Sequence, residues 1–383
     1  MKTSLRSLPA PSQADLIAIA EIFQGEGCVQ MVQPLGNGNV NDTYLVQATS
    51  GLSVLQRLNT RVFNQPELVL QNLQVLGTHV DQKLSRGSAH PLLKQRRWEL
   101  PSLLRTKTNN QSWHRCPAGH VWRSISFVPD CTCVDVVEGA DQARELGIGL
   151  GLFHLLISDL PPAALADTLE GFHITPSYLE AYHRALVQTD RQPNAARERC
   201  IAFIREREAS CDVLERAKQR GDLPLRPIHG DPKINNVLLD RLSGQAVALI
   251  DLDTVKPGLV HYDIGDCLRS CCNRLGEETD QLEAVQFDLD LADALLEGYL
   301  GVAGDFLSDV ERGYIPEAAR LISFELGLRF FCDHLQGDTY FKADYPDHNL
   351  QRALVQFQLS ASIETQLPQL RALVERHAVA ATV

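Results

Sequence analysis

The hydrophobic pattern divides the chain into a strand-rich first third and a helical remainder. Apolar and polar positions alternate in several stretches before residue 129, and a Gly/Asn cluster separates the first two. Such alternation predicts half-buried strands. The strands are predicted as two within 29–48 and one each over 53–58, 99–107 and 120–128, with helices over 14–23 and 66–76.

Helical spacing dominates after residue 129. Apolar residues recur every three to four positions in several stretches, which predict helices. These helices cover 141–156, 176–189, 198–220, 282–300, 316–335 and 350–376. An apolar segment with a turn at 228–251 predicts a hairpin between them. The pattern therefore predicts an α+β fold with a β-rich lobe over 1–128 and a larger, mostly helical lobe over 129–383.

Four polar residues in this hairpin form a spaced motif. His229, Asp231 and Asn236 follow the pattern H-x-D-x-x-x-x-N, and the apolar stretch V-A-L-I then leads to Asp251. Phosphoryl transfer from ATP needs one carboxylate that orients the acceptor hydroxyl, and an amide and a second carboxylate that hold Mg²⁺. The motif therefore predicts a kinase site with Asp231 as the catalytic base. Asn236 and Asp251 are the predicted Mg²⁺ ligands.

The sequence around the motif is similar to small-molecule kinases rather than to protein kinases. It has H-G-D in place of H-R-D and I-D-L-D in place of D-F-G, and no A-P-E segment follows. The pattern resembles the aminoglycoside phosphotransferase and choline kinase superfamily. Within it, I-D-L-D-T-V-K-P-G with Y-D-I-G-D-C-L-R is most similar to the N-acetylhexosamine 1-kinases. The resemblance implies a bilobal protein-kinase-like fold. It also implies an enzyme that uses ATP and Mg²⁺ to phosphorylate a sugar.

A Gly/Asn turn between the first two predicted strands is a candidate phosphate-binding loop. Glycines let backbone N–H groups approach phosphate without a Cβ in the way, although such turns also join ordinary hairpins. The following V-N-D-T-Y resembles the corresponding loop of the N-acetylhexosamine kinases. The residues expected to bind the nucleotide phosphates are Gly36, Asn37, Gly38 and Asn39.

The third predicted strand lacks the lysine with which other kinases hold the α- and β-phosphates. V-L-Q-R-L-N offers Gln56, where an ungapped alignment puts the lysine, and Arg57, which carries a charge. The two side chains point to opposite faces of a regular strand, so only one can reach the nucleotide. We expect Arg57 to do so, because a guanidinium can form two hydrogen bonds to phosphate. Lys233 is a candidate contact for the γ-phosphate, although an ordinary exposed lysine would fit the same position.

The acceptor pocket is expected in the helical lobe. Residues 326–342 place an arginine among apolar residues and a tyrosine eleven positions later. This segment resembles the part of the N-acetylhexosamine 1-kinases that contributes an arginine and a tyrosine to the sugar pocket, which implies acceptor contacts for Arg329 and Tyr340. The alternative is a structural ion pair and a core tyrosine. The segment G-F-H-I-T-P-S over 171–177 is also similar to the family and has no assigned role.

Charge and composition narrow the class of partner. Residues 1–128 carry a net charge of +6 and the remainder −18, within a total of −12. The acidic balance argues against a nucleic-acid partner, and no apolar run has the length of a membrane span. The N-terminus lacks the apolar core of a signal peptide, and ten cysteines are dispersed along the chain. Both features predict a cytoplasmic location with reduced thiols; the sequence sets no oligomeric state.

These observations predict a Mg²⁺-dependent kinase that transfers the γ-phosphate of ATP to the anomeric hydroxyl of an N-acetylhexosamine. An amino alcohol or an aminoglycoside is the alternative acceptor, since the acidic large lobe suits a cation. A nucleotide-binding pseudokinase is the alternative from another class, because the usual lysine is missing. The intact set of Asp231, Asn236 and Asp251 argues against a pseudokinase.

Overall fold

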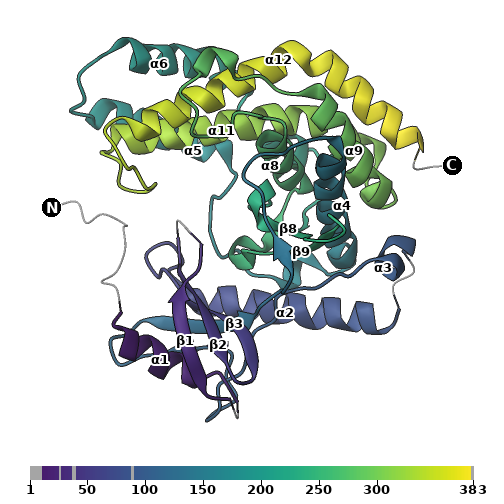
Figure 1. Cartoon of the computed structure of the whole chain (residues 1–383). Helices are drawn as coiled ribbons and strands as arrows, with labels where there is room; N and C mark the ends of the chain where they lie inside the picture. The colour runs from purple at the N-terminus through teal and green to yellow at the C-terminus, as the bar shows by residue number, and fades with distance from the viewer. Residues whose placement is uncertain (1–10, 26, 37–39, 88–89, 381–383) are drawn as a thin grey trace.

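Two lobes of unequal size make up the protein, in a computed structural model that describes residues 11–25, 27–36, 40–87 and 90–380 (Figure 1). A five-stranded sheet dominates the smaller lobe, and helices dominate the larger one. The predicted α+β, bilobal, protein-kinase-like fold is confirmed.

The small-lobe sheet is antiparallel throughout and has the order β1-β2-β3-β5-β4. Its strands are β1 (Val29–Pro34), β2 (Asp42–Ala48), β3 (Gly51–Arg57), β4 (His114–Arg115) and β5 (Val121–Ser126). The predicted strand over 99–107 is wrong, since only Leu103 forms a bridge there, to Ile125. Pro101 offers no N–H to a strand ladder, which explains the failure of the alternating pattern at this place.

The two faces of this sheet have different neighbours. Helix α1 (Gln13–Glu21) covers one face, where its apolar residues cluster with Leu55 and Trp122. On the other face, Val121 packs against Leu70 of α2 (Pro66–Ser85). A short helix, α3 (Pro91–Gln95), follows. Because side chains alternate along a strand, neighbouring residues of β3 and β5 belong to different faces.

Helices form most of the large lobe. They are α4 (Ala140–Ile157), α5 (Thr175–Gln188), α6 (Ala195–Arg207), α7 (Val213–Gln219), α8 (Val260–Cys271), α9 (Leu289–Ala303), α10 (Asp309–Gly313), α11 (Ile315–Leu335) and α12 (His348–Ala380). The helix predicted over 198–220 is instead two helices, separated by a 3-10 turn at Glu208–Ser210. A Cβ at Gly147 of α4 would lie 2.1 Å from the carbonyl oxygen of Leu295, so glycine lets α4 and α9 touch. In the described part of the chain, no helix combines the length and apolar character needed to cross a membrane.

Short strands place the predicted catalytic hairpin beneath the helices. They are β6 (Cys131–Thr132), β7 (Arg226–Ile228), β8 (Val237–Asp240), β9 (Ala246–Leu249) and β10 (Lys256–Gly258). Strands β8 and β9 form the hairpin, and β6 pairs with β8 immediately after the chain leaves the small-lobe sheet. Val128 packs with Val247 of β9. The predicted lobe boundary between 128 and 129 falls in this connection.

Candidate active site

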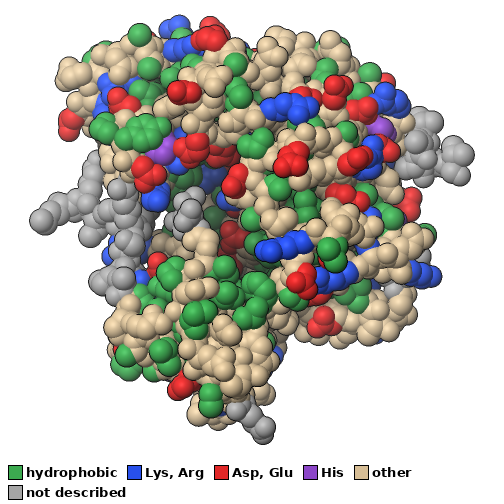
Figure 2. All heavy atoms as spheres, in the orientation of Figure 1, with side chains coloured by type: hydrophobic (Ala, Val, Ile, Leu, Met, Phe, Trp, Pro, Cys, Tyr) green, Lys and Arg blue, Asp and Glu red, His purple; other side chains and the backbone are tan. Residues whose placement is uncertain are grey.

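A cavity of about 520 Å³ lies between the lobes and is visible as a hollow in Figure 2, with charged side chains inside it. Its wall includes Asn41 from the small lobe, Asp231 and Lys233 from the loop after β7, and Arg329 from α11. A cavity of this size is typical of small-molecule sites. Residues distant in sequence therefore meet in one space.

The H-G-D turn follows β7 and needs glycine at its centre. Gly230 has a φ of +89°, and a Cβ at this position would lie 2.6 Å from the carbonyl oxygen of Thr254. L residues rarely adopt this φ, and the gap leaves no room for a side chain. Thr254 Oγ1 also donates to the carbonyl oxygen of His229 at 2.9 Å. The turn is therefore packed directly against the segment that follows Asp251.

Helix α8 holds the backbone of the same turn. The fully buried Asp263 accepts the N–H groups of His229 at 2.7 Å and Gly230 at 2.8 Å, and its Oδ2 lies 2.8 Å from His154 Nε2. Burial works to raise the pKa of Asp263, but the His154 ring and the backbone donors hold it below its ordinary value. His229 Nε2 lies 2.9 Å from the carbonyl oxygen of Ile250, and burial lowers the pKa of this imidazole. These contacts brace the loop through a neutral histidine.

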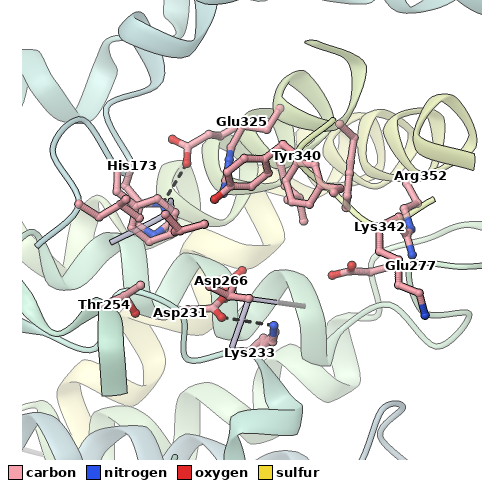
Figure 3. Close-up of a pocket in the computed structure, with 18 of the residues that line it drawn as sticks. His173, Asp231, Lys233, Thr254, Asp266, Glu277, Glu325, Tyr340, Lys342 and Arg352 are labelled. Carbon is pink, nitrogen blue, oxygen red and sulfur yellow. Dashed lines mark hydrogen bonds and ion pairs between the residues drawn. The ribbon is translucent and has the colours of Figure 1, made fainter. Parts of the chain in front are cut away.

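Asp231 lies at the cavity beside Lys233 of its own loop (Figure 3). Lys233 Nζ lies 3.3 Å from Asp231 Oδ2, and Asn236 Nδ2 donates to the Asp231 carbonyl oxygen at 2.7 Å. The Asp231 carboxylate raises the pKa of Lys233. The predicted base, the candidate phosphate-binding lysine and one predicted metal ligand are therefore adjacent.

Asp251 follows β9 in a left-handed backbone conformation, with a φ of 62°. Its side chain is exposed to solvent. Desolvation by the surrounding walls nonetheless raises the pKa of Asp251 to about 6, and the neighbouring carboxylates of Asp253 and Asp231 add to the rise. A cation bound at this place would relieve the crowding of negative charge.

The predicted Mg²⁺ ligands carry the oxygen donors that this ion prefers. The Ile250 N–H donates to the Asn236 carbonyl oxygen at 2.9 Å, which brings Asn236 beside the end of β9 and Asp251. Within the described residues, no group of three or more His, Cys, Asp or Glu side chains is arranged to hold a metal. Asn236 and Asp251 fit a Mg²⁺ ion that takes its other ligands from phosphate and water.

The candidate phosphate loop is described only at its edges. Gly36 has a φ of +69°, and an added Cβ would meet nothing within 4 Å. The other predicted loop residues lie outside the described residues: Asn37, Gly38 and Asn39. After the loop, Asn41 Nδ2 donates to Asp253 Oδ2 at 2.6 Å. The exit of the loop is thereby attached to the large lobe.

Gln56 and Arg57 lie on opposite faces of β3. Arg57 is on the face covered by α1, where its Nε donates to Asp42 Oδ2 at 2.7 Å and its guanidinium lies 5.8 Å from the centre of the Trp122 ring. Gln56 is on the other face, and its Oε1 accepts from Arg123 Nε at 2.9 Å. The charge of Arg57 is paired with Asp42, and Arg123 supplies a cation on the Gln56 face.

Arg329 of α11 lines the cavity without an acidic partner. Its guanidinium carbon lies 5.1, 5.2 and 5.4 Å from the ring centres of Phe172, Tyr178 and Phe341, respectively. Aromatic faces at this distance stabilise a cation. Among the described residues, no carboxylate oxygen lies within 4.0 Å of the Arg329 nitrogen atoms. The guanidinium is therefore framed by rings and open to a ligand.

Tyr340 lines the same cavity on a loop that α11 anchors. The Asp333 carboxylate accepts the backbone N–H groups of Thr339, Tyr340 and Phe341 at 2.7 to 2.9 Å. Tyr340 is 38% exposed, and its ring meets the Phe341 ring edge-on. It is therefore a wall residue rather than a core tyrosine. The structure brings both predicted acceptor residues to the cavity that contains Asp231.

A buried histidine that sequence reasoning missed connects this cavity to the catalytic loop. His173 Nδ1 lies 2.9 Å from Glu325 Oε1, and its Nε2 lies 2.6 Å from the carbonyl oxygen of Gly230. Burial opposes a charge, but Glu325 raises the pKa of His173 above its ordinary value. Both ring nitrogens therefore donate, and Figure 3 shows the His173–Glu325 contact. The segment G-F-H-I-T-P-S was the available signal, and only the fold reveals its partners.

A model of the phosphotransferase enzyme family matches residues 32–304. The microcompartment-associated aminopropanol kinase superposes with a TM-score of 0.61 at 15% identity, covering 94% of this chain and 98% of that one. The choline kinase from Cryptosporidium parvum Iowa II superposes with a TM-score of 0.60 at 12% identity, covering 94% of this chain and 97% of that one. An aminoglycoside phosphotransferase from Alicyclobacillus acidocaldarius subsp. acidocaldarius DSM 446 superposes with a TM-score of 0.59 at 16% identity, covering 97% of this chain and 98% of that one. The structural matches support the fold, and because the family model spans most of the chain, including the H-G-D loop and Asp251, the protein belongs to the phosphotransferase enzyme family.

Proposed function

We propose that the protein is a small-molecule kinase that transfers the γ-phosphate of ATP to the anomeric hydroxyl of an N-acetylhexosamine, with Mg²⁺ as cofactor. One observation carries the proposal: Asp231 and the unpartnered Arg329 line the same cavity. The carboxylate can position a hydroxyl for attack, and the guanidinium can donate to neutral oxygen atoms of the acceptor.

The loop residues have distinct roles in this reaction. Asp231 accepts the proton of the acceptor hydroxyl while the hydroxyl oxygen attacks the γ-phosphorus and ADP leaves. Mg²⁺, when held by Asn236 and Asp251, neutralises charge on the phosphates. Lys233, 3.3 Å from Asp231, supplies a positive charge near the transferred group. The turn at 36–39 and Arg57 are the contacts that the sequence predicts for the remaining phosphates.

The charges of the cavity wall favour a neutral acceptor over a cationic one. Several of its acidic side chains are already paired with cations. These pairs are Glu325–His173, Glu277–Arg269 and Glu278–Arg352. Arg329, by contrast, has no ion-pair partner among the described residues, and its positive charge repels an ammonium group. An acetamido sugar offers the hydroxyl and carbonyl oxygen atoms that such a wall can bind, and the Tyr340 ring offers a flat surface for the pyranose.

Two other functions would use parts of the same site. An amino alcohol or an aminoglycoside suits the negative charge of the large lobe, and kinases of this type share the fold at low identity. A nucleotide-binding pseudokinase suits the absent lysine of β3. The adjacent positions of Asp231, Lys233 and Asn236 favour a working phosphotransferase over the pseudokinase.

An acceptor panel tests the proposal directly. The purified protein with ATP and Mg²⁺ should consume ATP fastest with N-acetylglucosamine or N-acetylgalactosamine, and more slowly with glucosamine, choline or an aminoglycoside. Phosphorylation of the anomeric hydroxyl removes the reducing end, so loss of reducing sugar should equal ADP formed. Turnover confined to cationic acceptors would contradict the sugar assignment, and a product that still reduces would contradict the anomeric position.

A pair of variants tests the proposed role of Asp231 as the base. Asp231→Asn should lower kcat by at least about 100-fold with little change in ATP affinity, because general-base catalysis contributes about that much. Asp190→Asn, an exposed residue after α5, is the matched control. ATP binding by the wild type without turnover of any acceptor would favour the pseudokinase.

A further inference from the structure

The position at which other kinases carry a small-lobe lysine is occupied here by an uncharged residue with an unusual neighbour. Gln56 of β3 lies directly opposite Arg123 of β5 in the antiparallel register, so both side chains share one face of the sheet. Gln56 Oε1 accepts from Arg123 Nε at 2.9 Å and from Arg123 Nη2 at 2.8 Å. The glutamine therefore orients a guanidinium that comes from the neighbouring strand.

Arg123 extends from the small lobe to the predicted metal end of the large lobe. Its Nη2 forms an ion pair with Asp253 Oδ1, and both side chains are nearly fully buried, at 2% and 3% exposure. Asp253 Oδ2 accepts from Asn41, at the exit of the candidate phosphate loop. Arg123 is therefore linked through Asp253 to Asn41, which follows the candidate phosphate loop, and Asp253 comes two residues after the proposed Mg²⁺ ligand Asp251.

One nitrogen of Arg123 remains without a partner. Arg123 Nε and Nη2 both donate to Gln56, and Nη2 also pairs with Asp253. The buried Nη1 has no hydrogen-bond acceptor in the described part of the protein. A buried donor without an acceptor is unfavourable, and such groups in native structures call for a specific explanation. An anionic ligand beside Asn41 would provide the acceptor.

We propose that Arg123 is the cation that contacts the α- or β-phosphate of the bound nucleotide, in place of the lysine that β3 lacks. This inference rests on the proposed kinase function. Gln56 and Asp253 fix the guanidinium plane, and the free Nη1 donates to a phosphate oxygen. Arg57 does not meet this description, because it lies on the opposite face of the sheet and pairs with Asp42.

Nucleotide binding measured by calorimetry tests the assignment without any acceptor. ADP carries the phosphates and adenosine lacks them, so their affinity ratio reports the phosphate contact alone. Arg123→Ala should weaken ADP binding by about 10- to 100-fold, the range for a hydrogen bond to a charged group, and leave adenosine binding unchanged. Arg96→Ala is the matched control, because the Arg96 side chain is also buried and ion-paired, but to Glu145 at 2.7 Å rather than to Asp253; it should leave the ratio unchanged.

An exchange variant separates a phosphate contact from a structural role. Gln56→Lys combined with Arg123→Gln returns the cation to β3 and should recover ADP affinity relative to Arg123→Gln alone, including when Arg123→Ala does not fold. Equal losses for ADP and adenosine, no recovery in the exchange variant, or a changed ratio in Arg57→Ala but not in the Arg123 variants would each overturn the inference. A wild type that binds no nucleotide would overturn this inference and the proposed function together. The predicted ratios without turnover of any acceptor would overturn only the proposed function.

Discussion

At the residue scale, Gly230 shows why this loop reads H-G-D. Its positive φ and the 2.6 Å between an added Cβ and the Thr254 carbonyl oxygen exclude any side chain. Gly244, in the turn between β8 and β9, also has a positive φ, of +72°, but an added Cβ would meet nothing within 4 Å. Substitution of Gly244 therefore tests backbone strain alone, and substitution of Gly230 tests backbone strain together with steric contact.

Alanine at these two glycines should have unequal effects. Gly244→Ala should lower the free energy of unfolding by about 1–2 kcal/mol, the cost of a left-handed L residue, and leave kcat unchanged. Gly230→Ala should lower it further and reduce kcat by at least about tenfold, because the displaced loop misplaces Asp231. Urea unfolding and steady-state kinetics measure both quantities. Equal changes for the two variants would show that the Thr254 contact is unimportant.

Side chains within one short segment can be proposed together from sequence, whereas contacts across the fold cannot. Asp231, Asn236 and Asp251 lie within one hairpin, and the motif spacing is sufficient to predict them as a set. The contact of Arg123 with Asp253 joins residues 130 positions apart, and no local pattern reports such a distance. Strand alternation did show that Gln56 and Arg57 face opposite ways, but not which face meets the large lobe.

At the element scale, α11 and the start of α5 are joined to the H-G-D loop through Glu325 and His173. Thr175 Oγ1 donates to Glu325 Oε2 at 2.7 Å, and the Glu325 Oε1 contact with His173 continues to the Gly230 carbonyl oxygen. Hydrogen bonds therefore connect the α11 wall of the cavity to the backbone beside Asp231. The charge of His173 contributes to this connection, because its pKa is raised in the folded protein.

The pH dependence of stability should reveal this charge. The stabilisation from a raised histidine pKa is fully present below the unfolded value of about 6.5 and is lost as pH rises through the folded value. Between pH 6 and pH 9 the wild type should therefore lose more free energy of unfolding than Glu325→Gln, measured by urea titration. Glu317→Gln, on the same helix but paired with Arg320 and Arg371, should keep the wild-type slope. Parallel curves for the wild type and Glu325→Gln would mean that His173 is neutral.

Helices and strands were predicted correctly where the hydrophobic pattern was long. The prediction failed where a proline or the packing of the core determined the structure. The strands within 29–48 and the helix over 316–335 were predicted correctly. The stretch over 99–107 alternates like a strand, but Pro101 prevents regular pairing. The helix over 198–220 has continuous helical spacing, yet the chain turns at Glu208–Ser210 so that Cys211 and Leu214 reach the core.

At the scale of the whole molecule, Asp253 joins the two lobes. It receives Arg123 from the sheet and Asn41 from the end of the candidate phosphate loop, with nearly no exposure to solvent. Salt screens such a buried pair much less than a surface pair. Removing one partner leaves the other buried and unpaired, which is strongly destabilising. Asp253 is therefore one of the contacts that join the lobes, beside others such as the hydrogen bond from Asn72 of α2 to the Val255 carbonyl oxygen.

A double-mutant cycle should measure this connection. Asp253→Asn and Arg123→Gln should each lower the free energy of unfolding, and the double variant should lose less than their sum, with a coupling of about 0.5–3 kcal/mol. Thermal or urea unfolding of the four proteins supplies the values. Additive losses would show that the pair contributes little to joining the lobes. The exposed pair Arg115–Glu67 in the small lobe is the reference, with an expected coupling below about 1 kcal/mol.

The hydrogen bonds from the loop at 339–341 to Asp333 of α11 have a consequence for how the side chains of this loop can change. One carboxylate holds three successive N–H groups of the loop that carries Tyr340, and this loop and α11 are separate in sequence from the hairpin that carries Asp231. Because Asp333 binds the backbone of this loop, its side chains can be exchanged over evolutionary time, or in directed evolution, while the backbone stays in place. Under the proposed function, a change of acceptor would require substitutions in this segment alone and would leave the proposed phosphoryl-transfer residues intact.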